Sequence, residues 1–188
     1  MSNYVDIHVN KISVVEVSNL FITLSLQENI PINKTFLKNL IYMSYGWFST
    51  FSNNPLLNEK FFASKNGLKL LSLDRLFNDN IIEEQIIEMK MVKRDNNIYA
   101  EYIIAIPEDR GMLLFLHKIW DMYKNYKEED FYIYTESELS PCQIILAIEN
   151  FNNIHSSNGV GLHENNSKTS IPLMMETIQQ QFYNLFKR

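Results

Sequence analysis

The sequence has few of the residues that cross-link or interrupt a fold. Its 188 residues include one cysteine, five glycines and five prolines. The single cysteine, Cys142, excludes an internal disulfide, which favours a reducing compartment. No apolar run approaches the roughly 18 to 20 residues that a membrane-spanning helix needs, and the first residues do not resemble a signal peptide. We therefore expect a cytoplasmic protein without a membrane partner.

Positive charge is also scarce. The 17 Lys and Arg residues against 22 Asp and Glu residues give a net charge of −5. Because a nucleic acid attracts basic surfaces, it is not an expected partner of this chain. The sequence is rich in apolar residues instead, since 46% of its residues are hydrophobic and 13% are aromatic. This composition is typical of one globular domain with a proper core.

Two long helices are predicted in the first third of the chain. Ser13, followed three residues later by Glu16, is a capping box, and apolar residues at helical spacing follow it to about residue 28. Asn33 is suited to cap a second helix, which is hydrophobic over a wide arc. Such an arc is typical of a central helix, so we expect its Tyr42 and Trp47 to serve folding.

Alternating apolar residues predict one β-hairpin. The apolar positions on either side of the polar turn 94–97 are Ile87, Met89, Met91, Ile98, Tyr99, Tyr102 and Ile104. The turn contains Asp and Asn, which tolerate the positive φ angles of tight hairpin turns. We expect this hairpin near residues 86–106.

The rest of the chain shows weaker signals of secondary structure. Further helices are expected at residues 72–77, after Asp109, at 142–151, and from Pro172 to about 186. We expect irregular structure from Pro55 to Leu70 with a turn at Gly67, a lead-in at residues 1–11 and a mobile loop at 152–170. The predicted class is therefore mostly α (α+β), a single helical domain of about five helices with one small antiparallel hairpin.

No group of residues forms a recognisable catalytic or metal-binding motif. His117 and Asp121 share a helix face, but no His-Glu-x-x-His pattern accompanies them. Cys142 could pair with His155 or His163 as nucleophile and base, but both histidines fall in the predicted loop. We therefore expect no metal, no cofactor and no enzymatic activity, and a cysteine-dependent enzyme stays an alternative.

Short motifs occur along the chain in a fixed order. The first group is Ile32, Leu37, Leu40, Tyr42, Gly46 and Trp47. The second group is Pro55, Leu56, Glu59, Phe61, Ala63, Lys65, Gly67, Ser72, Leu73 and Phe77. Later groups are Leu116, Ile119, Trp120 and Tyr123, then residues 135–142, then Ile171-Pro172. This series resembles the Panacea family, the SocA-like antitoxins and proteolytic adaptors of bacteria and their phages.

The resemblance implies that the chain binds a protein: a toxin that it neutralises and presents to a protease. The alternative is a phage- or pathogen-encoded regulatory or host-directed interaction protein on the same scaffold. Residues 64–71 and 135–142 depart from the family's pattern, and binding loops on a rigid scaffold vary in this way. The predicted partner-binding residues are Ser64, Lys65, Asn66, Gly67, Leu68, Thr135, Glu136, Ser140, Pro141 and Cys142.

Overall fold

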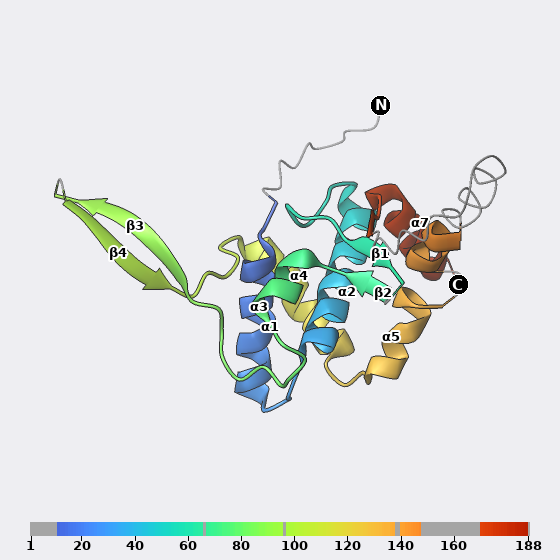
Figure 1. The fold of residues 1–188 in the computed structure, drawn as a ribbon, viewed down its shortest axis with the longest axis horizontal. Coiled ribbons are helices and arrows are strands. Elements are labelled where there is room, and N and C mark those ends of the chain that lie inside the picture. Colours follow the sequence, from blue (N-terminus) through green and yellow to red (C-terminus); the bar gives the residue numbers. More distant parts are fainter. Residues whose placement is uncertain (1–10, 66, 96, 138–139, 148–169, 188) are drawn as a thin grey trace, which may run out of the picture.

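A computed structural model describes residues 11–65, 67–95, 97–137, 140–147 and 170–187 (Figure 1). The helices are α1 (Val14–Glu28), α2 (Lys34–Ser52), α3 (Leu71–Leu76), α4 (Arg110–Tyr123), α5 (Glu128–Thr135) and α7 (Met175–Phe186), and residues 141–147 are also helical. The strands are β1 (Phe62–Ser64), β2 (Gly67–Lys69), β3 (Glu88–Arg94), β4 (Asn97–Ile103) and β5 (Ile171–Pro172). The predicted class, mostly helical with a small antiparallel hairpin, is confirmed. The predicted lead-in and mobile loop lie almost entirely outside the described residues.

The first two helices begin where their caps predict. The hydroxyl of Ser13 accepts a hydrogen bond from the Glu16 amide at 3.1 Å, and the Glu16 carboxylate accepts one from the Ser13 amide at 2.7 Å. The side chain of Asn33 accepts from the backbone of the first turn of α2 at 2.8 Å. Asn29 and Asn53, each with φ of 56°, end the two helices in the left-handed conformation that asparagine tolerates.

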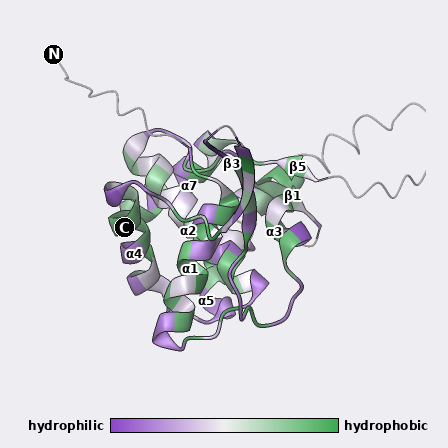
Figure 2. Cartoon of the chain, turned by 90° about the vertical axis from the view of Figure 1, so that its left-hand side faces the viewer, coloured by the Kyte–Doolittle hydropathy of each residue, from purple (hydrophilic) through white to green (hydrophobic). Residues whose placement is uncertain are grey.

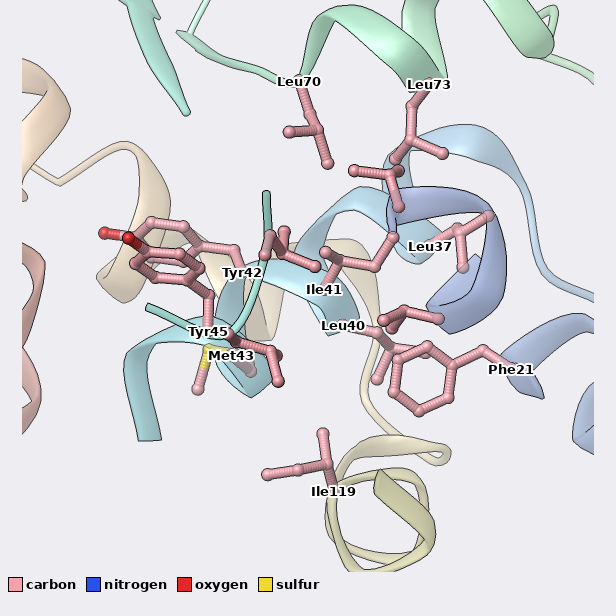
Figure 3. Close-up of a cluster of buried hydrophobic side chains, with 14 of the residues drawn as sticks. Phe21, Leu37, Leu40, Ile41, Tyr42, Met43, Tyr45, Leu70, Leu73 and Ile119 are labelled. Atoms are coloured by element: carbon pink, nitrogen blue, oxygen red, sulfur yellow. The ribbon is translucent and has the colours of Figure 1, made fainter. Parts of the chain in front are cut away.

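The core surrounds α2, which contacts α1, α3, α4, α5 and α7. The buried side chains that meet in this core include Phe21, Leu37, Leu40, Ile41, Tyr42, Met43, Leu70, Leu73 and Ile119 (Figure 3). Tyr42 is 1% exposed, which agrees with the folding role predicted for it. The wide hydrophobic arc of α2 therefore reflects partners on several sides.

A glycine lets α7 pack directly on the backbone of α2. A Cβ atom at Gly46 would lie 2.1 Å from the ring of Phe182 on α7, a distance that no real contact shows. The neighbouring Trp47 packs its ring edge-on against Phe182, with centroids 5.1 Å apart, and donates a hydrogen bond to the Tyr123 hydroxyl at 2.8 Å. Gly46 and Trp47 thus fix the positions of α7 and α4 against α2.

A second small sheet replaces the irregular stretch expected between residues 55 and 70. Its strand order is β2-β1-β5, and Gly67, with φ of 89°, is the first residue of β2, directly after the turn and opposite Ser64. The prediction for Pro172 is wrong, because this residue pairs with Phe62 in β5 and α7 begins at Met175. Proline is tolerated there because β5 is an edge strand, where no ladder amide is needed. Helix α5 was also not predicted from the sequence.

Candidate protein-binding surfaces

The two segments predicted to bind a partner lie next to each other. A Cβ atom at Gly67 would lie 3.3 Å from the carboxylate of Glu136, and the backbone of Ser64 lies close enough to the thiol of Cys142 to lower its pKa. The β1–β2 hairpin therefore packs against the stretch that follows α5. The departures from the family's pattern are neighbours in space.

Most of the predicted partner-binding residues are buried. Ser64, Leu68, Thr135, Ser140 and Cys142 are each 6% exposed or less. Gly67 and Pro141 are buried too, whereas Lys65 and Glu136 are exposed, and Asn66 lies outside the described residues. Of the described residues in this set, a partner that binds the folded chain can reach only Lys65 and Glu136. A recognition role for the segments stays a prediction.

The chemistry around Cys142 favours a neutral thiol. Burial raises the pKa of Cys142, while the nearby Ser64 backbone and the ammonium of Lys38 oppose that shift. A neutral thiol is the less nucleophilic form. His155 and His163 lie outside the described residues, and His117 is exposed. Among the residues that the structure describes, no group of three or more His, Cys, Asp or Glu side chains could hold a metal ion.

A different surface stands out, on a hairpin that projects from the body of the molecule (Figure 1). We call β3, β4, the turn between them and the two flanking residues at each end (86–87 and 104–105) the arm. The two strands pair over seven positions, from Glu88 opposite Ile103 to Arg94 opposite Asn97. The turn residue Asp95 has φ of 47°, the positive angle that the sequence predicts for it. The arm confirms the predicted hairpin but is not covered by the core.

One side of the arm is almost entirely apolar. Residues opposite each other in the ladder share a face, and residues two apart along a strand do so as well. The ladder places Met89, Met91, Ile98, Ala100 and Tyr102 on one face, with Lys93 at its outer end. Ile87 and Ile104 flank the strands, are also exposed and continue the same alternation, so we include them in the apolar face. Tyr102 is 74% exposed, Ile98 67%, Ile87 64%, Met89 61% and Met91 60%. The opposite, polar face consists of Glu88, Lys90, Val92, Arg94, Asn97, Tyr99, Glu101 and Ile103. Figure 2 shows the resulting alternation of hydrophobic and hydrophilic residues along β3.

A buried asparagine of α1 holds both legs of the arm. The side-chain amide of Asn19 donates to the backbone carbonyls of Ile86 and Ala105, each at 2.9 Å. Its oxygen accepts from the Ile86 amide at 2.7 Å. Asn19 is 0% exposed, so water does not compete for these bonds. Sequence reasoning missed this residue, and its one signal was an asparagine inside a helix, where asparagine is intrinsically unfavourable.

Charge is distributed unevenly along the arm. At its base, a hollow of about 540 Å³ is lined in part by the carboxylates of Glu16, Glu88 and Glu108, with Lys90 beside them. At its outer end, Lys93 is exposed on the apolar face, whereas Arg94 on the polar face forms a salt bridge with Glu101 and Asp95 stands in the turn. The arm therefore has an acidic base and a single lysine, Lys93, at the outer end of its apolar face.

Comparison with known proteins identifies no relative, because no family model, no curated protein and no solved structure matches this chain. The likeness to the Panacea family therefore stays a prediction. Within the described ranges, no helix combines the length and the apolar character that a membrane crossing requires.

Proposed function

We propose that this chain is a protein-binding module whose contact surface is the apolar face of the arm. The observation that carries the proposal is the exposure of five large apolar side chains on one face of a projecting hairpin. Proteins rarely leave such a patch in water unless another molecule covers it. An isolated two-stranded hairpin is itself only marginally stable, and a partner on its apolar face would stabilise it.

The size of the face suits a protein. The exposed fractions of its side chains correspond to on the order of 600 Å² that a partner could cover, close to the roughly 800 Å² that each side of a standard interface contributes. The face is a projecting ridge, whereas small-molecule sites are concave. Its only charged side chain is Lys93, and the chain as a whole is acidic, which does not suit a phosphate backbone.

Within this class, the ordered motifs favour an antitoxin or adaptor that binds a toxin protein in the cytoplasm and presents it to a protease. Gly46 and Trp47, which belong to that motif series, support the scaffold by positioning α7 and α4. The altered segments 64–71 and 135–142 favour the alternative, a regulatory or host-directed target on the same scaffold. Both versions need a protein partner and no catalytic group.

Two tyrosines on β4 provide a matched test. Tyr102 lies on the apolar face and Tyr99 on the polar face, so Tyr102→Ser and Tyr99→Ser make the same chemical change on opposite sides of one strand. Affinity purification of the tagged chain from its native cell should recover a partner in near-equal amounts. Buried interface tyrosines are often hot spots, so we expect Tyr102→Ser to reduce recovery about tenfold or more and Tyr99→Ser to leave it within about twofold. Equal recovery with the two variants would contradict the proposal.

A further inference from the structure

We infer that the partner of the apolar face is a second copy of this chain, packed face to face and antiparallel about a twofold axis. The inference rests on the proposed function and names the molecule that covers the arm; a toxin or other target would then bind a different part of the chain. Three features support it: the order of large and small side chains on β4, the charge pattern along the arm, and the area of the face.

One pair of side chains on β4 is complementary in size across such an axis, whereas the pairs Ile98–Ile104 and Met89–Met91 place large side chains against each other. Along the apolar face, the small Ala100 lies between two large residues, Ile98 and the most exposed side chain of the face, Tyr102. A twofold axis that passes between Ala100 and Tyr102 places each Tyr102 ring over the gap at Ala100 of the other copy. Alternation of large and small residues lets two facing layers interdigitate, and a twofold interface requires this kind of self-complementarity.

The charges select the antiparallel orientation. With the same axis, Lys93 at the tip of one arm lies over Ile87 at the base of the other. The exposed carboxylates of Glu83 and Glu84 immediately precede that base. A parallel arrangement would instead bring the two Lys93 side chains together and the two acidic bases together, where like charges repel. In the antiparallel dimer, each Lys93 therefore lies at the acidic base of the other arm.

The area of the two faces fits a modest but specific dimer. Two faces of on the order of 600 Å² each would bury about 1,200 Å², the lower end of the range for stable specific interfaces. We therefore expect dissociation in roughly the micromolar range. Because each arm projects from its body, the antiparallel arrangement places the two bodies at opposite ends of the paired arms (Figure 1).

Sedimentation velocity of the purified full chain tests the dimer directly. We expect the wild type and Tyr99→Ser to pass from monomer to dimer between about 0.1 and 100 μM, and Tyr102→Ser to weaken the association about tenfold or more. Circular dichroism of each variant checks that the fold is kept. A wild-type chain that stays monomeric up to about 100 μM, well above the expected dissociation constant, would overturn the inference.

Charge reversal separates this dimer from non-specific association. Lys93→Glu alone, and Glu83→Lys with Glu84→Lys, should each weaken self-association about tenfold or more at low salt, because each places like charges at both ends of the interface. Mixed together, the two variants should form a heterodimer of about wild-type affinity, since every reversed charge then meets its opposite. A mixture no more associated than its components would overturn the antiparallel arrangement.

The outcomes for the two proposals are separable. If the chain is a monomer but Tyr102→Ser still loses a partner recovered from the cell, the second-copy inference is wrong and the proposed function stands. If Tyr102→Ser changes neither self-association nor partner recovery, both are wrong.

Discussion

Replacing Asn19 with leucine removes the amide that holds both legs of the arm while keeping a side chain of similar volume. The change leaves one amide, that of Ile86, and two carbonyls, those of Ile86 and Ala105, without their partner. An unpaired buried polar group costs about 1 to 3 kcal/mol. Ile86 and Ala105 are only half-buried, so water recovers part of that cost and the lower end applies. The sum is about 3 kcal/mol, or roughly a hundredfold in the equilibrium for detaching the arm.

Native-state hydrogen exchange is the assay that resolves this effect. Because the lost bonds join the arm to α1 and do not involve the core around α2, the change should act as local opening. We expect the amides of the arm's base, that of Ile86 first, to exchange about a hundredfold faster, while those of α2 change little.

Ser18 provides the matched control for Asn19. It is the preceding residue of α1 and equally buried, but its hydroxyl has no hydrogen-bond partner among the described residues. Ser18→Ala should therefore leave exchange in the arm unchanged. If Asn19→Leu accelerates exchange in α2 as much as in the arm, or leaves the arm protected, the reasoning about its attachment is refuted.

Three further outcomes follow from the core and its charges. Gly46→Ala should lower the free energy of unfolding by about 2 to 3 kcal/mol and the Tm by several degrees, because the methyl group of the alanine would overlap the Phe182 ring. Adding Phe182→Leu to the same chain should recover part of that loss. Cys142 should react slowly with a thiol reagent at pH 8 until the chain unfolds, because burial raises its pKa, and Cys142→Ser should leave partner binding intact. The hydrogen bond from Lys124 lowers the pKa of Glu28 below its usual 4.5. The ionised Glu28 carboxylate therefore stabilises the fold above pH 4.5, and this stabilisation is lost as the pH falls further and the carboxylate is protonated. Glu28→Gln should make the Tm less dependent on pH below 4.5.

The sequence predicted the arm but not its exposure. Alternation of apolar and polar residues, together with Asp95 in a polar turn, placed the hairpin correctly. The same alternation would appear if the apolar face packed on the chain's own core, which is the usual arrangement for antiparallel strands. Periodicity identifies a face that must be covered, but it does not identify the molecule that covers it.

The small sheet could not be predicted because its strands are too short to show a period. Strands β1 and β2 have three residues each and β5 has two, whereas alternation needs about four to eight residues to be recognised. The pairing of Phe62 with Pro172 joins segments far apart in the sequence. Only tertiary packing decides that Pro172 belongs to an edge strand, since its local signal is equally that of a helix start.

The candidate site was the least predictable part. The departure of residues 64–71 and 135–142 from the Panacea pattern predicts a recognition surface there, but such a departure carries no information on burial. Cys142 and Ser64 are both buried, and the backbone of Ser64 is near enough to the Cys142 thiol to affect its pKa, so a substitution at one position bears on the other. The role of Asn19 in anchoring the arm could not be predicted from the sequence. Its hydrogen-bond partners are backbone groups, which every residue has.

The outer edges of the arm are a second place where a partner could bind. A two-stranded hairpin exposes unpaired backbone groups along both outer edges, and each edge could accept another strand. Strand β3 carries Glu88, Lys90, Lys93 and Arg94, and charged side chains, lysine above all, discourage strand addition. The apolar face has no such protection, since Lys93 at the tip is its only charged side chain. At β3, the sequence of the arm therefore favours a partner that packs on the apolar face over one that adds a strand to the edge. Antiparallel packing of two arms is an arrangement of the first kind.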